Sequence, residues 1–169
     1  PAIGVVGLGI MGSAFASHLI DAGHTVVGFD VRASRRRALL GAEAFAAKAA
    51  RNAGVIAAAT CRDVGQQASI VITSLPSADA LMLTVVELGK GTQRPRIVIE
   101  TSTLPIEVKE RARSRLDARG VVLLDCPISG TGAQARARDI VVYASGSRTA
   151  YRRVAPLLRV LARAHYFVG

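Results

Sequence analysis

The chain has 169 residues, half of them apolar, and carries a formal net charge of +10 at pH 7. That much apolar material is enough for one hydrophobic core, so we expect one domain over residues 1–169. No apolar run approaches the roughly 20 residues that cross a bilayer, and no basic segment precedes the first apolar stretch as in a secretory signal. These features exclude a membrane-spanning helix and predict a cytoplasmic protein.

The positive charge can indicate a nucleic-acid partner, because 22 Lys and Arg outnumber 12 Asp and Glu. The arginines, however, are spread over several helical patterns, and aromatic residues make up only 4% of the chain. The stacking platforms of single-strand binders are therefore missing. We interpret the arginines as solvated helix faces and expect a small-molecule ligand, not a nucleic acid.

The two cysteines, Cys61 and Cys126, lie far apart, with no CxxC motif and no clustered histidines. This spacing argues against a zinc site and against a disulfide framework, and we expect no bound metal. Both cysteines are interpreted as small buried apolar residues.

Apolar segments alternate with helical patterns along the chain, which predicts stacked βαβ units. We expect an α/β fold of the Rossmann type, with a doubly wound, mainly parallel sheet and helices on both faces. The expected strands are Ala2–Val6, Thr25–Asp30, Val55–Ala58, Ser69–Ser74, Arg96–Glu100, Val121–Leu124, Asp139–Ser145 and the final HYFVG. The expected helices are Met11–Ala22, Ser34–Arg51, Arg62–Gln67, Ala78–Leu88, Pro105–Arg119 and Ser147–Ala164.

The turn between the first strand and the first helix contains three glycines in the spacing G-x-G-x-x-G. Gly7 permits a tight turn, Gly9 lets the backbone approach a pyrophosphate, and Gly12 lets the helix pack closely on the sheet. A glycine turn without a ligand is the alternative, but an acidic residue also ends the second strand, as a dinucleotide site requires. We predict that phosphates rest on the segment Gly7, Leu8, Gly9, Ile10, Met11 and Gly12.

That acidic residue is Asp30, which follows Gly12 by 18 residues, close to the ~20 expected for the carboxylate that binds the adenosine ribose. A carboxylate there repels a 2′-phosphate, so NAD is the expected cofactor. Arg32, Arg35, Arg36 and Arg37 follow, and an arginine in this place can neutralise a 2′-phosphate. NADP therefore remains an alternative.

Two more strands end in residues suited to a ligand crevice, since strand carboxyl ends line the crevice of a doubly wound sheet. One end has Leu75 and Pro76 before Ser77, a candidate helix N-cap, as is Ser34 earlier in the chain. The other has the hydroxyls of residues 101–103, which can bond a ribose or a substrate. Capping of the next helix by Thr103 is the competing interpretation.

The loop DCPISGTGAQ, residues 125–134, is composed of small and hydroxyl-bearing residues and fits neither a helix nor a strand. The chain resembles the β-hydroxyacid dehydrogenase family over nearly its whole length. Four segments carry the resemblance, in the family's order: GVVGLGIMGSAFASHLIDAGHTV, ITSLPSADAL, ETSTLP and DCPISGTGAQARARDIVVYASG. This family includes 3-hydroxyisobutyrate, tartronate semialdehyde and threonate enzymes and is related to 6-phosphogluconate dehydrogenase. The resemblance implies an N-terminal nicotinamide-dinucleotide-binding domain of an oxidoreductase that acts on a small hydroxy acid.

The resemblance also implies roles for individual residues. Ser129, Gly130 and Thr131 would bind the substrate, the first two holding its carboxylate, which suits a hydroxyl and exposed backbone N–H groups. Cofactor contacts outside the glycine turn would come from Asp30, Val31, Arg32, Leu75, Pro76 and Thr103.

Three features depart from the family pattern. Thr131 replaces a second glycine, adding a hydroxyl and bulk where the substrate should lie. His18 replaces an asparagine, and we expect it to pack between helices. The chain after Asp30 is longer by about ten residues, which we interpret as the lengthened helix Ser34–Arg51, without a chemical role.

The family's general acid/base is a lysine in a glycine-rich motif beyond this domain, and none of Lys48, Lys90 and Lys109 lies in such a motif. We therefore expect no catalytic residue in this chain, with the lysine beyond Gly169 and the family's C-terminal helical domain absent. The chain should bind its cofactor without turnover. The resemblance further implies that the full-length enzyme is a homo-oligomer.

Two other functions stay open. One is a non-catalytic dinucleotide-binding or nucleic-acid-associated module that keeps the fold and uses its basic surface. The other is an imine reductase of related fold.

Overall fold

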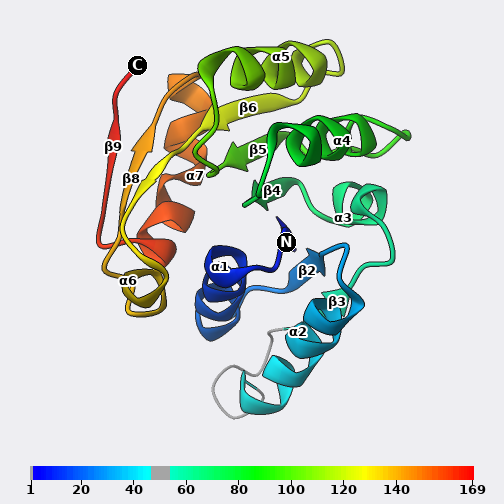
Figure 1. Ribbon diagram of the computed structural model, residues 1–169, viewed down its shortest axis with the longest axis vertical. Coiled ribbons are helices and arrows are strands. Elements are labelled where there is room, and N and C mark those ends of the chain that lie inside the picture. Colours follow the sequence, from blue (N-terminus) through cyan, green and yellow to red (C-terminus); the bar gives the residue numbers. More distant parts are fainter. Residues whose placement is uncertain (1, 47–53) are drawn as a thin grey trace.

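The computed structural model describes residues 2–46 and 54–169 (Figure 1). Its main sheet has six parallel strands in the order β3-β2-β1-β4-β5-β6. This arrangement is the predicted doubly wound sheet, in which the chain moves outward from β1 first to one side and then to the other. The six strands are β1 (Ile3–Val6), β2 (Val26–Phe29), β3 (Val55–Ala57), β4 (Ile70–Thr73), β5 (Ile97–Glu100) and β6 (Val122–Asp125).

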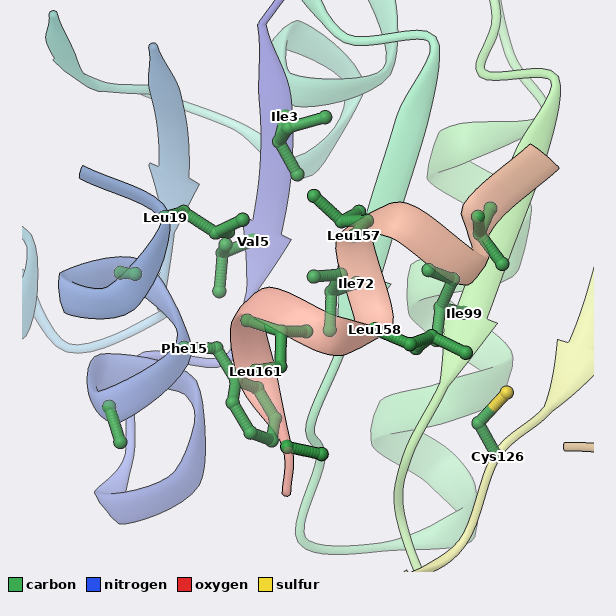
Figure 2. Close-up of a cluster of buried hydrophobic side chains, with 14 of the residues drawn as sticks. Ile3, Val5, Phe15, Leu19, Ile72, Ile99, Cys126, Leu157, Leu158 and Leu161 are labelled. Carbon is green, nitrogen blue, oxygen red and sulfur yellow. The ribbon is translucent and has the colours of Figure 1, made fainter. Parts of the chain in front are cut away.

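Helices cover both faces of the sheet. Successive strand residues point to opposite sides, so the apolar strands present side chains on both faces that must be buried. Ile3, Val5, Ile72 and Ile99 pack on one face against side chains of α1 and α7, as Figure 2 shows. Val6, Val71 and Val98 pack on the other face against α3, α4 and α5. The helices are α1 (Ile10–Asp21), α2 (Ala33–Ala46), α3 (Cys61–Gln67), α4 (Ala78–Leu88), α5 (Ile106–Asp117), α6 (Gly132–Arg136) and α7 (Arg148–Leu161).

A second, three-stranded sheet contains β7 (Ile128–Ser129), β8 (Val141–Ala144) and β9 (Ala164–Phe167). β7 pairs antiparallel with β8, and β8 pairs parallel with β9. An isolated bridge between Asp125 and Ser145 connects this sheet to the end of β6. The prediction that residues 125–134 form neither helix nor strand is wrong, because the segment holds β7 and the start of α6. Elements of two and five residues are too short to show a period in the sequence.

The other predicted elements are present, with bounds that differ from the predicted ones by at most three residues except in α2. The predicted end of α2 at Arg51 lies outside the described residues. Ser34 is not its cap, because the helix already begins at Ala33. Thr103 does not cap α5 either, since Pro105 is the N-cap and supplies no side-chain bond. Ser77 does cap α4, accepting a bond from the Ala80 N–H.

Cys61 and Cys126 are buried as predicted, and both are free thiols. Burial raises the pKa of each thiol to about 12, so both stay protonated and behave as apolar residues. None of the helices in the described part of the chain combines the length and hydropathy that a membrane crossing requires.

Candidate functional site

The predicted ligand-binding segments meet at one edge of the main sheet, because all six of its strands run parallel and their carboxyl ends coincide. β1 lies between β2 and β4 at the point where the strand order reverses. The Gly7 N–H donates to the Phe29 carbonyl over 2.8 Å, and the Ser74 N–H donates to the Val6 carbonyl over 3.0 Å. The glycine turn thus begins at the switch point where doubly wound sheets bind their ligands.

The three glycines of this turn serve different purposes. Gly7 has φ of +89°, and a Cβ there would lie 2.1 Å from the Ser74 carbonyl oxygen. A Cβ on Gly12 would lie 1.8 Å from the Gly7 carbonyl oxygen, so these two glycines are required by the fold. Gly9 has φ of −72°, and its added Cβ would meet nothing nearer than the Arg35 guanidinium at 3.7 Å. The bare backbone at Gly9 leaves room for a ligand.

The N-terminus of α1 faces this open space without a capping side chain. Gly9 is the N-cap and makes no side-chain bond, and the first turn contains no acidic residue. The Ser13 N–H is the first to bond back, to the Gly9 carbonyl, so the N–H groups of Ile10, Met11 and Gly12 precede the helical ladder. These N–H groups and the positive end of the helix dipole are of the kind that binds anions in other proteins.

Asp30 is buried beside the turn and uses both carboxylate oxygens. The Leu8 N–H donates to Oδ2 and the Arg32 N–H donates to Oδ1, each over 2.8 Å. The Arg35 guanidinium lies 3.1 Å from Oδ2. Burial works against ionisation, but the backbone N–H groups of Arg32 and Leu8 and the Arg35 charge prevail and hold the pKa of Asp30 below its usual value. Asp30 is therefore an anion that fixes the glycine turn to the end of β2, while Val31 beside it is exposed.

The hydroxyls predicted at the end of β5 divide into two groups. Thr101 Oγ1 donates to the Thr73 carbonyl over 2.8 Å, and Ser102 Oγ accepts from the Leu75 N–H over 2.8 Å. Both residues are buried, so their hydroxyls hold β4 and β5 together. Thr103 is exposed at the same edge, as is Pro76. Of the three hydroxyls, the one on Thr103 is placed to meet a ligand.

The predicted substrate loop lies against the N-terminus of α1. A Cβ on Gly132 would come within 2.2 Å of Ile10 Cγ2, so the loop and the glycine turn share a wall. Ser129 and Gly130 are exposed, and Gly130 has φ of +141°. Thr131 caps α6, with its Oγ1 accepting from the Gln134 N–H over 3.3 Å and its own N–H donating to Gln134 Oε1 over 2.9 Å. The Thr131 hydroxyl therefore caps a helix, whereas the family pattern alone led us to expect it beside the substrate.

His18 packs α1 against α6, as predicted. Its Nε2 lies 2.7 Å from the Ala135 carbonyl oxygen, and the Arg138 Nε lies 3.1 Å from its Nδ1. A carbonyl only accepts and a guanidinium only donates, so in these two bonds Nε2 is the donor and Nδ1 the acceptor.

Sequence reasoning missed Lys109, which is buried on α5 beside Glu100 and Asp125. A signal was present, because Lys109, Ala112 and Leu116 follow the spacing of a buried helix face. The charge of the lysine conceals this signal when the sequence is divided into apolar and polar positions.

Comparisons with known proteins agree with this geometry. L-threonate dehydrogenase of Cupriavidus necator is 29% identical over 170 residues, covering 99% of this chain and 54% of its own length. Mycobacterium tuberculosis 3-hydroxyisobutyrate dehydrogenase with L-serine has the same fold, with a TM-score of 0.87 and 24% identity over 98% of this chain and 53% of its own. An imine reductase of Streptomyces aurantiacus matches with a TM-score of 0.84 and 25% identity, covering 100% of this chain and 56% of its own.

The chain therefore spans about half the length of the relatives it matches. A family model described as the NAD binding domain of 6-phosphogluconate dehydrogenase matches residues 2–169. Because the match extends over nearly the whole sequence, and the glycine turn, Asp30 and the switch-point strand all fall within it, this chain belongs to that family of NAD-binding domains.

Proposed function

We propose that this chain is the cofactor-binding part of a dehydrogenase that transfers a hydride between nicotinamide and a small hydroxy acid. The observation that carries the proposal is the open backbone at Gly9 in front of the uncapped N-terminus of α1. Gly7 and Gly12 lack side chains for internal reasons, whereas nothing inside the fold requires a glycine at position 9. Space for a pyrophosphate explains it.

The residues present fit an NAD molecule. The N–H groups of Ile10, Met11 and Gly12 would bind the pyrophosphate, and the Asp30 carboxylate would accept bonds from the adenosine ribose hydroxyls. Leu75, Pro76 and Thr103 border the same edge. A bound nicotinamide would supply the hydride acceptor for the alcohol carbon of the substrate, whose hydroxyl proton would pass to a base, or in the reverse direction the hydride donor for the carbonyl form.

On the substrate side, Ser129 and Gly130 would hold a carboxylate through a hydroxyl and backbone N–H groups. Their loop touches the glycine turn through Gly132 and Ile10, which supports a substrate bound beside the cofactor. The names of the relatives, a threonate and a 3-hydroxyisobutyrate dehydrogenase, support a hydroxy acid as the substrate class. Among the described residues we assign no general acid/base, and we expect this chain by itself to bind the cofactor without turnover.

The test compares two glycine-to-alanine variants by NADH fluorescence titration. Gly9→Ala should fold normally, because φ is negative and the Cβ meets nothing within 3.7 Å, yet it should weaken NADH binding at least about tenfold by crowding the phosphates. Gly41→Ala is the matched control, since its Cβ would meet nothing within 4 Å and it lies away from the turn. Equal NADH affinity in the original chain and in a folded Gly9→Ala variant would refute the proposal.

An imine reductase is the second candidate, favoured by the likeness to the Streptomyces aurantiacus enzyme. A protein with this function needs no carboxylate clamp. Ser129→Ala therefore separates the two, measured by protection of the loop amides from hydrogen exchange in the presence of NAD and a hydroxy acid. If the hydroxy acid protects the loop amides in the original chain and this protection is lost in Ser129→Ala, the dehydrogenase is supported. If the acid does not protect the Ser129 and Gly130 amides even in the original chain, the reductase is supported.

A further inference from the structure

We propose that Lys109 is a positioning residue for the cofactor edge, which it shapes through Ser102 and Leu75 without touching the ligand. This inference rests on the proposed function only where it concerns NAD binding. Its structural part, the control of the Leu75 backbone by a buried lysine on α5, stands on the contacts alone.

The Lys109 ammonium is enclosed by three acceptors. The residue is 5% exposed, and its Nζ forms an ion pair with Glu100, which is fully buried. Nζ also lies 2.6 Å from Asp125 Oδ1 and 2.6 Å from the Ser102 carbonyl oxygen. Two of the three N–H donors of the ammonium are thus hydrogen-bonded, and Glu100 balances its charge through the ion pair.

Ser102 is held at both ends of its backbone by this ion pair. Its N–H donates to Glu100 Oε1 over 2.9 Å, while its carbonyl accepts from Lys109. The orientation of Ser102 is thereby fixed, and its Oγ accepts the Leu75 N–H over 2.8 Å. Hydrogen bonds thus connect Asp125 at the end of β6, through Lys109 on α5 and Ser102 after β5, to Leu75 after β4.

Energetics favours positioning over stability as the purpose of these contacts. Removing an ammonium and a carboxylate from water is costly, and apolar residues of similar size often stabilise a core equally well. A buried charge network is instead directional: the Lys109 ammonium donates to Asp125 and to the Ser102 carbonyl, and it pairs electrostatically with Glu100, whose Oε2 forms no hydrogen bond. A pocket of about 100 Å³ opens beside Lys109 and Asp125, on the side facing solvent. The groups that Lys109 orients, Ser102 and Leu75, lie at the edge where Thr103 and Pro76 are exposed.

The first measurement is amide hydrogen exchange by NMR on the free chain. Lys109→Met should raise the exchange rate of the Leu75 amide at least about tenfold relative to the Val5 amide in β1, because Ser102 loses its fixed orientation. Lys90→Met is the control. This substitution removes the same charge, but from a lysine that pairs with Glu87 on the surface. An unchanged Leu75 rate, relative to Val5, would overturn the inference. If Lys109→Met does not fold, the pair Glu100→Gln with Lys109→Met removes both buried charges together and takes its place.

The second measurement is a double-mutant cycle for NADH affinity. Ser102→Ala and Lys109→Met should each weaken NADH binding several-fold. Because both act on Leu75, the double variant should have about the NADH affinity of whichever single variant binds NADH less tightly. Additive losses, or normal binding by Lys109→Met despite a faster Leu75 exchange, would overturn the link to the cofactor. Failure of the unaltered chain to bind NADH would refute the proposed function instead, and the exchange measurement would still decide the role of Lys109.

Discussion

At the scale of single residues, the sequence predicts where the glycine turn and Asp30 lie, between β1 and α1 and at the end of β2. Close backbone contacts leave no choice of residue at two of these positions, Gly7 beside the Ser74 carbonyl and Gly12 beside the Gly7 carbonyl. Lys109 could not be predicted in the same way, because its partners Glu100 and Asp125 lie on different strands and meet it only after folding. A buried charge is visible in a sequence only when its partners are known.

The pairing of Asp30 with Arg35 bears on the choice between NAD and NADP. The Asp30 carboxylate disfavours a 2′-phosphate, whereas the partly exposed Arg35 guanidinium beside it offsets that repulsion. We expect Arg35→Ala to lower NADPH affinity about tenfold and NADH affinity by no more than about threefold. Fluorescence titration with both cofactors checks this.

Arg37→Ala is the matched control for that titration, since it removes the same charge from the same helix at an exposed position. It should leave both affinities nearly unchanged. Equal losses of NADH and NADPH binding in Arg35→Ala would show that Arg35 supports Asp30 and does not discriminate between the cofactors.

At the scale of elements, the strands β1, β2, β4 and β5 are predictable because each is a short apolar run that is largely buried on both faces. β7 and α6 are not, since their few residues depend on contacts for their conformation. The short α6 is fixed by the capping box of Thr131 and Gln134 and by the bond from His18 to Ala135. Thr131, which departs from the family pattern, is thus explained by its role as the N-cap of α6.

Capping by Thr131 predicts a loss of stability when the hydroxyl is removed. Thr131→Ala should reduce the free energy of unfolding by about 1 kcal/mol, and Thr131→Ser should retain most of it, because serine caps equally well. Thermal and urea unfolding measure the difference. If both variants unfold like the original chain, the hydroxyl has no structural role, and a role in substrate binding becomes the better explanation of Thr131.

At the scale of the whole molecule, the positive charge is divided between the two helical layers. Exposed arginines of α5 lie on one face of the sheet, at positions 111, 113 and 115. Those of α7 lie on the opposite face, at positions 148, 152, 153 and 159. These two sets of arginines therefore do not lie together on one face of the main sheet.

This division predicts weak binding of nucleic acid. A labelled DNA duplex should bind this chain no more tightly than non-specific complexes do, with a Kd of about 1–100 μM at physiological salt. Fluorescence anisotropy at several salt concentrations tests this, with NADH titration of the same sample as the reference. Tight DNA binding with a steep salt dependence, together with no NADH binding, would favour a nucleic-acid-associated module.

The close contact between Gly7 and Ser74 has a consequence for how the site forms. β1 is the first strand of the chain, yet it pairs with β4, some 67 positions later at Ile70. Ser74, the residue directly after that later strand, donates its N–H to the Val6 carbonyl, and its own carbonyl lies so close to Gly7 that a Cβ there would sit 2.1 Å away. During synthesis the turn can therefore reach its final shape only after β4 has joined the sheet. Dinucleotide binding by a nascent chain would thus mark the moment at which the two halves of the sheet come together.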